Sequence, residues 1–246
     1  MSGRLDTLAA LVEAARRAGA DAADAMLVAA ASLSVQRRLG KVEQLERSEE
    51  FGLGLRVFVG RRQAIVSSTD ASPAGFAALA ERAVAMARVV PEDPFAGLPE
   101  APDGLVAADL DLADAAEPTA EQLIARAAEA EEAALAVAGV TNSEGAEAGW
   151  SRAEIALAAS NGFAGAYLRT SHSVSATALA GQGTAMERDY DYATAVHLAD
   201  LEDAAAIGRR AGERAVARLN PRRPRTARLP VVYDPRVAAS LLGHLA

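Results

Sequence analysis

The chain has 246 residues, a length that fits one large domain or two small ones. Hydrophobic residues make up 51% and charged residues 24%, which excludes wholesale disorder. The 33 acidic residues outnumber the 25 basic ones, and the net charge of -8 disfavours general nucleic-acid binding. The lack of cysteine excludes disulfides, thiolate metal ligands and a catalytic thiol.

The opening stretch carries Asp6 and Glu13 inside its apolar pattern, which is not typical of a signal peptide. No apolar run reaches the roughly 18 residues that a membrane helix needs. We therefore expect a cytoplasmic protein without a membrane segment.

Apolar periodicity in the first half predicts a helix, a series of strands ending in a hairpin, and a second helix. The expected ranges are helix 5–18, strands 25–39, 42–47, 51–60 and 63–69, and a helix from Pro73 that stops before Pro91. Residues 91–118 are rich in Pro, Asp and Ala, which indicates a long connection with one short strand at most.

The second half repeats this order. Thr119 caps a predicted helix, Asn161-Gly162 is a strong hairpin signal, and Asn220-Pro221 ends the last helix. The expected ranges are helix 120–138, strands 140–145, 149–160, 163–179 and 185–198, and helix 201–219.

The repeated order predicts an α+β fold of two similar units, each an antiparallel sheet flanked by helices, that arose by internal duplication. The segments FGLGL and NGFAG occupy the same place in the two units. We expect a first unit at 1–95, a connection at 96–118, and a second unit at 119–220. Residues 221–246 would hold a linker, a strand at 230–233 and a helix from 236.

No catalytic, cofactor-binding or metal-ligating constellation is evident. The histidines His172, His197 and His244 show no HExxH or HxxxH spacing, so no helix-borne zinc pair is predicted. We favour a solvated strand position for His172 and a partly buried, hydrogen-bonded one for His197. A metal-ligand role for His244 is disfavoured.

Three other features have competing interpretations. The arginines at 222, 223, 225 and 228 indicate a solvated linker, or else a docking surface for an acidic partner. In the segment 187–192, one strand face holds the tyrosines and the other the carboxylates; we expect the carboxylates to face water. Gly52 and Gly54 resemble a phosphate loop, but a bulge or close strand approach fits better because no helix follows.

Several long segments resemble the TldD/PmbA family, whose older name is modulator of DNA gyrase. They are FGLGLRVFVGRRQAIVSSTDAS, SNGFAGAYLRTSHSVSATALA and ERDYDYATAVHLADLEDAAAIGRRAGERAVARLNPRRPRTARLPVVYDP. This resemblance implies a zinc metalloprotease complex of a TldD and a TldE (PmbA) subunit that acts on flexible peptides.

The resemblance also indicates which side of the complex this chain represents. TldD proteins carry HExxxH on the helix after a PVVL-type strand, where this chain reads Leu241-Leu242-Gly243-His244. The ligand and general base are missing from that register, so a TldE-like subunit without its own metal is expected, with zinc only in a TldD-type partner. The alternatives are a standalone peptide-binding or scaffold module, and a fragment of an active metallopeptidase whose site lies beyond residue 246.

Family members are nearly twice as long, so we expect this chain to be an N-terminal portion. Val237, Leu241 and Leu245 would form an apolar stripe on the last helix. Exposure of that stripe predicts self-association or a frayed end.

Overall fold

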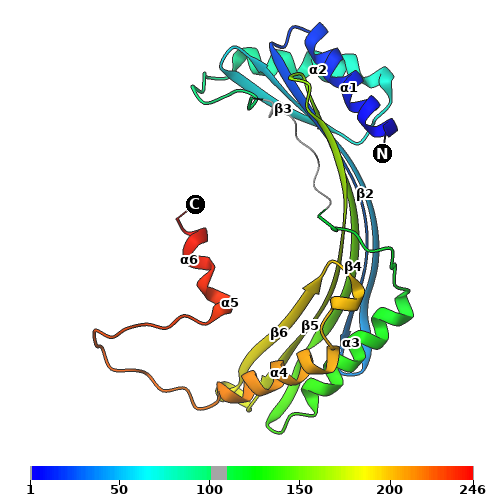
Figure 1. The fold of residues 1–246 in the computed structure, drawn as a ribbon. Coiled ribbons are helices and arrows are strands. Elements are labelled where there is room, and N and C mark those ends of the chain that lie inside the picture. Colours follow the sequence, from blue (N-terminus) through cyan, green and yellow to red (C-terminus); the bar gives the residue numbers. More distant parts are fainter. Residues whose placement is uncertain (1, 101–109, 246) are drawn as a thin grey trace.

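The computed structural model describes residues 2–100 and 110–245 of the chain. Its centre is one strongly curved, six-stranded antiparallel sheet with the strand order β3-β2-β1-β4-β5-β6 (Figure 1). The strands are β1 (Ala22–Arg38), β2 (Lys41–Val59), β3 (Arg62–Ser68), β4 (Val140–Ala159), β5 (Ala164–Ala180) and β6 (Glu187–Ala195). The fold class is therefore α+β, as predicted.

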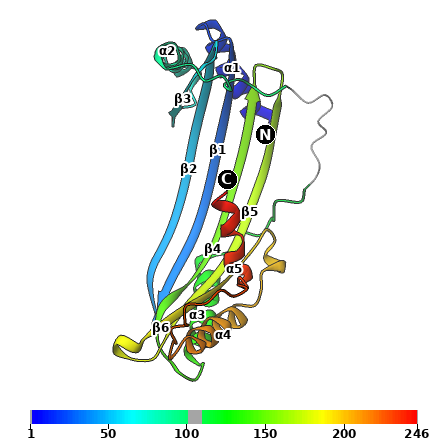
Figure 2. The same cartoon turned by 90° about the vertical axis from the view of Figure 1, so that its left-hand side faces the viewer.

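All four long helices cover the same face of this sheet. They are α1 (Ser2–Arg17) and α2 (Pro73–Val89) at one end, and α3 (Ala120–Leu135) and α4 (Ala204–Ala217) at the other. Leu27 of β1 belongs to the first helix-covered core and Leu33 to the second. Because six residues separate them, both side chains point to one face of the strand. Within the described residues, no helix packs on the opposite, concave face along the middle of the sheet (Figures 1 and 2).

The expectation of two separate sheets is wrong, because β1 and β4 pair along their length and join both halves in one sheet. Each half does contain a helix, three strands and a helix in that order. The duplication itself stays a prediction.

Two strands are longer than predicted. Residues 41–59 form the single strand β2 where two strands were expected, and residues 140–159 form β4 in the same way. The polar segment 46–50 lacks the alternating apolar pattern, yet its backbone pairs with β1. Backbone pairing continues there without a buried side chain on every second position. In β4, by contrast, Ala146 and Ala148 are buried at 2% and 0% on either side of the exposed Glu147, so the alternation of small residues continues through the predicted gap.

The expected strand at 230–233 does not form, and the last predicted helix is two short ones, α5 (Pro235–Ala238) and α6 (Ser240–Gly243). Two short 3-10 turns are also present, η1 (Gly183–Ala185) and η2 (Leu198–Asp200). Gly52 and Gly54 lie in regular pairing with β1, so of the two expected alternatives the bulge is wrong. No helix of the described residues is long and apolar enough to span a membrane.

Small residues allow α3 and α4 to pack closely. A Cβ placed on Gly208 would lie 1.9 Å from the Ala130 carbonyl oxygen, and one on Gly212 would lie 2.9 Å from that of Ala134. The two helices therefore approach backbone to backbone, a separation that only glycine permits at these two positions.

A buried carboxylate ties the two halves together. Glu131 of α3 is 1% exposed and accepts hydrogen bonds from the Leu39 and Gly40 backbone N–H groups at 2.6 and 3.1 Å. These two residues form the β1–β2 turn and have positive φ angles of 47° and 78°. Such paired N–H groups suit an anion, so Glu131 fixes the tip of the first hairpin against the second half.

Candidate functional site

The open face of the sheet is the first element of the candidate site. Its centre carries a row of serines at one level of four neighbouring strands, and successive members of the row pair in the register. The row consists of Ser48, Ser32, Ser151 and Ser171. Small uncharged side chains let another polypeptide backbone approach the sheet, and each hydroxyl both donates and accepts hydrogen bonds.

Two tyrosines line the same face at its β6 end. Tyr190 and Tyr192 are 47% and 53% exposed, and their rings stack with centroids 6.2 Å apart. Exposed tyrosines offer apolar contact area together with a hydroxyl, a combination enriched at binding surfaces. The open face thus combines a polar floor with an aromatic rim.

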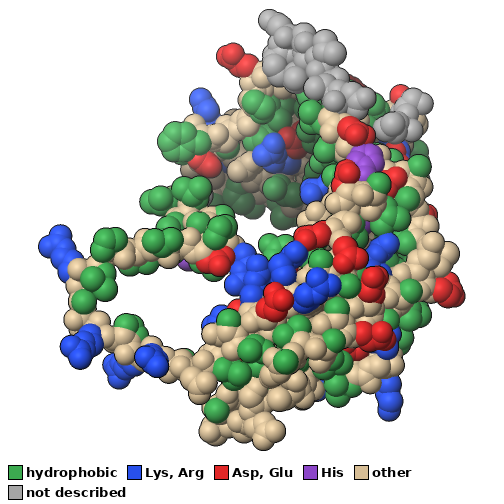
Figure 3. All heavy atoms as spheres, turned by 60° about the horizontal axis from the view of Figure 1, so that its bottom comes forward, with side chains coloured by type: hydrophobic (Ala, Val, Ile, Leu, Met, Phe, Trp, Pro, Cys, Tyr) green, Lys and Arg blue, Asp and Glu red, His purple; other side chains and the backbone are tan. Residues whose placement is uncertain are grey.

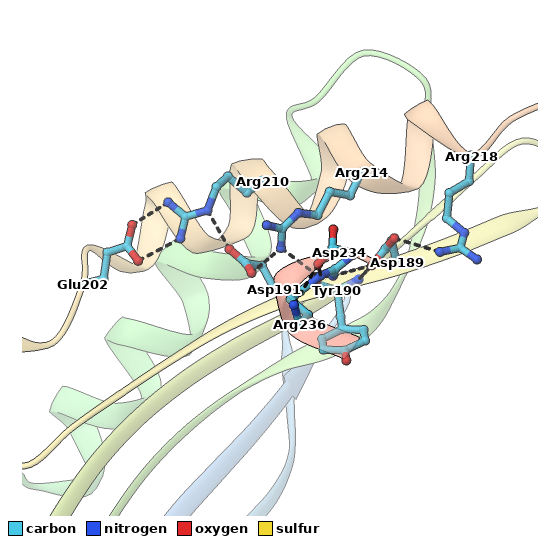
Figure 4. A network of polar contacts seen from close by, with 9 residues as sticks. All are labelled: Asp189, Tyr190, Asp191, Glu202, Arg210, Arg214, Arg218, Asp234 and Arg236. Carbon is cyan, nitrogen blue, oxygen red and sulfur yellow. Dashed lines mark hydrogen bonds and ion pairs between the residues drawn. The ribbon is translucent and has the colours of Figure 1, made fainter. Parts of the chain in front are cut away.

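The predicted split of residues 187–192 into two faces is confirmed, but its orientation was wrong. The tyrosines face the open side, whereas Asp189 and Asp191 are buried under α4 at 6% exposure each. Burying carboxylates requires cationic partners, and α4 with its C-cap residue supplies them at a spacing of four residues. The arginines that face β6 are Arg210, Arg214 and Arg218 (Figure 4).

Asp191 is the centre of the first part of this network. Its carboxylate binds Arg210 at 2.6 Å and also accepts a hydrogen bond from Arg214. Arg210 binds Glu202 as well, and hydrogen bonds to Glu202 and Asp191 raise the pKa of its guanidinium. The charges are therefore balanced where the helix covers the strand.

Asp189 is the centre of the second part. It binds Arg218 at 3.1 Å and Arg236 at 3.0 Å. Burial alone would raise the pKa of the Asp189 carboxyl, but hydrogen bonds from the two guanidiniums and a backbone N–H hold it below its ordinary value.

Arg236 links the C-terminal segment to the candidate site. Besides Asp189, it donates to the Tyr190 carbonyl oxygen at 3.1 Å, and its guanidinium lies 5.5 Å from the centre of the Tyr190 ring. The short helix α5 is thereby held at the β6 edge, and α6 stands apart from the sheet on its concave side (Figures 1 and 2). The exposed apolar residues on these two helices are Val237, Leu241 and Leu242.

The basic segment between α4 and α5 loops away from the body, with its arginine side chains in blue (Figure 3). Its members Arg222, Arg223, Arg225 and Arg228 are all exposed. This agrees with the predicted solvated linker and leaves the segment accessible to an acidic partner.

The position of His172 contradicts the expectation of a solvated strand residue. It is fully buried on the helix-covered face, beside Trp150 in the β4–β5 register, and its Nε2 lies 3.4 Å from Asp114 Oδ2. Burial lowers the pKa of His172, against the opposing effect of the Asp114 carboxylate. The polar residues around His172 led to the prediction of an exposed position. The serines, however, lie on the face of the strand opposite to residues 170 and 172, so they do not indicate the surroundings of His172.

His197 is partly buried, as predicted, and its Nε2 lies 3.1 Å from Asp111 Oδ1. Burial opposes protonation of this ring, but the Asp111 carboxylate outweighs it and raises the pKa of His197. Asp114 also accepts hydrogen bonds from the Leu198 and Ala116 backbone N–H groups. Sequence reasoning missed this junction, which fixes the connection to β5 and η2.

Zinc would need at least three suitably placed donors. Among residues 2–100 and 110–245, no group of three or more His, Asp or Glu side chains is placed to hold a metal ion, and His244 lies exposed after α6. The donor set of the described residues therefore does not fit a zinc centre, and no step through a metal can be derived from it.

Two family models match the chain. Residues 23–87 match PmbA/TldA metallopeptidase domain 1, and residues 113–219 match the PmbA/TldA metallopeptidase central domain. Metalloprotease PmbA of Escherichia coli O157:H7 is 34% identical over 227 residues, which are 92% of this chain and 50% of that protein. The PmbA homolog of Haemophilus influenzae is 30% identical over 96% of this chain and 52% of that protein. The chain spans about half the length of the curated relatives it matches.

Solved structures share the fold. A protein of Bacteroides thetaiotaomicron described as a modulator of DNA gyrase superposes with a TM-score of 0.89 at 23% identity, over the whole chain and 56% of that protein. TldE of Thermococcus kodakarensis gives a TM-score of 0.66 at 15% identity, over 83% of this chain and 46% of that protein. The chain belongs to the PmbA/TldD family of metallopeptidases, as its sequence resemblance predicted. The curated relatives that it matches are PmbA proteins.

Proposed function

We propose that this chain is a TldE-like subunit of a TldD/TldE zinc metalloprotease complex that acts on flexible peptides, with the catalytic zinc in a TldD-type partner. The observation that carries the proposal is the long open face of the sheet, which offers small polar side chains and exposed tyrosines instead of a core. Similarity to PmbA proteins supports the same assignment.

In this proposal the open face lines the space that receives an extended peptide. The serine row would contact the peptide backbone, and Tyr190 and Tyr192 would contact its side chains. The ion pairs between β6 and α4 would hold the aromatic rim in place. The chain would supply binding and shape, while the metal-bound water and general base come from the partner.

Co-purification and peptidase assays test this proposal. We expect a tagged form of the chain to retain a TldD-type protein, and we expect cleavage of a casein-like flexible substrate only when both are present. Ser151→Arg, on the open face, should reduce cleavage by the pair, whereas Ala77→Arg, at an exposed position of α2, should not. Cleavage by this chain alone, or equal effects of the two arginines, would contradict the proposal.

The alternative of a standalone peptide-binding or scaffold module rests on the same open face. It predicts peptide binding without any retained TldD-type protein. The alternative of an active metallopeptidase with a site beyond residue 246 predicts stoichiometric zinc in a longer form of the protein, which elemental analysis would detect.

We also propose the division into units 1–95 and 119–220 with a connection at 96–118, an origin of the two units by duplication, and a cytoplasmic location. Superposing α1-β1-β2-β3-α2 on α3-β4-β5-β6-α4 tests the duplication. If the strands and helices do not overlay in this connectivity, the duplication is wrong.

A further inference from the structure

The outer edge of β2 is only partly covered. β3 pairs with residues 53–59 of β2 and ends at Ser68, opposite Leu53. From there to the β1–β2 turn, residues 41–52 have β1 on one side and no strand on the other within the described part of the chain (Figure 2).

The register fixes which backbone groups face outward there. The two-residue turn at Gly60-Arg61 makes Val59 and Arg62 a hydrogen-bonded pair, so alternate residues from Val59 bond to β3. Phe58, in the other phase, accepts a hydrogen bond from Asp21 on the β1 side. No register shift interrupts β2 between 45 and 59. In the part of β2 that β3 does not cover, the backbone N–H and C=O groups that point outward are therefore those of Leu45, Arg47, Glu49 and Phe51.

The other outer edge is occupied at comparable positions. On β6, the Tyr190 N–H donates to Asp189 Oδ1 at 2.8 Å, and its carbonyl accepts from Arg236 and Arg214. On β5, beyond the end of β6, the Thr170 N–H donates to the Leu112 carbonyl at 3.0 Å. Contacts of this kind block the addition of a further strand. Among the described residues, no such contact engages the four outward-facing residues of β2.

The open part of the β2 edge is acidic. Four carboxylates lie within residues 43–52, on Glu43, Glu46, Glu49 and Glu50, and the single guanidinium there, Arg47, is engaged by Glu49 and Glu117 at 3.2 and 3.3 Å. Two such edges would repel each other, which disfavours a second copy of this chain as the occupant.

A groove lies on the helix-covered side of the sheet, with β2 as one of its walls. Its volume is about 390 Å³, and its lining includes Ala29 and Ala31 of β1, Glu49 and Phe51 of β2, Arg152 and Glu154 of β4, and Arg4 of α1, which pairs with Glu154 at 3.0 Å. A strand added to β2 would direct alternate side chains to this side of the sheet. The alanines and Phe51 can receive the aliphatic part of a lysine or arginine, while Glu49 faces its charge.

We propose that residues 43–52 of β2 bind an extended, cationic peptide segment by strand addition, with alternate side chains of that segment in the groove beside Phe51. This gives a place and a charge preference to peptide binding, and it does not depend on a protease partner.

Fluorescence anisotropy with labelled ten-residue peptides tests this proposal on the full chain. The probes are a peptide of alternating Lys and Thr, the same peptide with Glu in place of Lys, and the Lys–Thr peptide N-methylated on every backbone nitrogen. We expect the Lys–Thr peptide to bind at least tenfold more tightly than either of the others. Methylation of every backbone nitrogen removes the N–H donors along both edges of the strand but leaves the charge unchanged.

Charge reversal tests the location. Glu46→Lys/Glu50→Lys should weaken binding of the Lys–Thr peptide roughly tenfold. Glu81→Lys/Glu213→Lys changes the net charge equally at exposed helical sites and should leave binding within about twofold. Hydrogen exchange should show added protection at the amides of Leu45, Arg47 and Glu49 when peptide is bound.

Equal binding of the N-methylated peptide would overturn strand addition. Equal loss of binding in the two charge-reversed proteins would overturn the assignment to β2. The N-methylated peptide requires no variant protein, so the first of these tests does not depend on how a substituted chain folds. Neither result would bear on the TldD-type partner, which co-purification tests separately.

Discussion

Replacing Gly208 by alanine should destabilise the second half of the protein. The added Cβ would lie 1.9 Å from the Ala130 carbonyl oxygen, whereas ordinary contacts of this kind begin near 3.4 Å. The α3 and α4 backbones must therefore separate by more than an ångström, which opens the core around them, where Leu123, Ile207 and several alanines are buried. Overpacking typically costs about 1–3 kcal/mol, and backbone contact places this site at the upper end.

Helix propensity partly offsets this cost, because alanine is better than glycine in a helix by about 1 kcal/mol. The expected net loss is about 2 kcal/mol in the free energy of unfolding. For a chain of this length, that corresponds to a fall in Tm of roughly 4–8 °C.

Thermal and urea unfolding followed by circular dichroism measure this effect. Gly75→Ala is the matched control, because its Cβ would meet Asp70 Oδ2 at 3.5 Å, an ordinary contact in the first turn of α2. We expect the control to keep or slightly raise the Tm. A Gly208→Ala protein that melts at or above the wild-type temperature would refute the close-packing argument.

Three further predictions concern the buried charges. Arg236→Ala should speed amide exchange across residues 234–245 at least tenfold by releasing α5 from β6, while Arg222→Ala, in the exposed linker, should not. Glu131→Ala should lower the free energy of unfolding by about 2–3 kcal/mol, because two backbone N–H groups lose their acceptor. The same substitution at the neighbouring, exposed Glu132 should lower it by under about 1 kcal/mol. Urea titration measures both values. The pKa of Asp189 is lower in the folded state than in the unfolded state, so its stabilisation is present above its unfolded pKa near 3.9 and is lost as the pH falls through the folded value. Asp189→Asn should therefore reduce the fall in Tm between pH 7 and pH 3; an unchanged fall would show that its ion pairs contribute nothing.

Local signals in the sequence predicted much of the secondary structure. Thr119 caps α3 as predicted, in a capping box with Gln122, and Pro73 stands at the start of α2. Asn161-Gly162 lies between β4 and β5 as predicted. These signals succeed because each depends on backbone groups within a few residues of the side chain.

Which face of a strand is buried depends on contacts with distant segments, so local signals could not predict it. In residues 187–192 the tyrosines and the carboxylates lie on opposite faces of the strand, and this pattern alone fits burial of either face. Only the three arginines at 210, 214 and 218, four residues apart, indicate that the carboxylates are the buried set. His172 alternates with serines, so its neighbours suggest exposure, although its own face is covered. Both errors share a cause: a period of two separates the faces of a strand but does not say which face a helix will cover.

The pairing of β1 with β4 has a consequence for how the chain reaches its fold. Residues that meet across this seam, such as Ala25 and Ala158, are more than 100 positions apart in the sequence. During synthesis β1 leaves the ribosome long before β4, so the edge of β1 that pairs with β4 stays unpaired in the interval. Closing so long a loop costs entropy before any contact is gained, so assembly of the seam should limit the folding rate. Until then the hairpin of β1 and β2 carries an unpaired edge, which favours pairing with another chain.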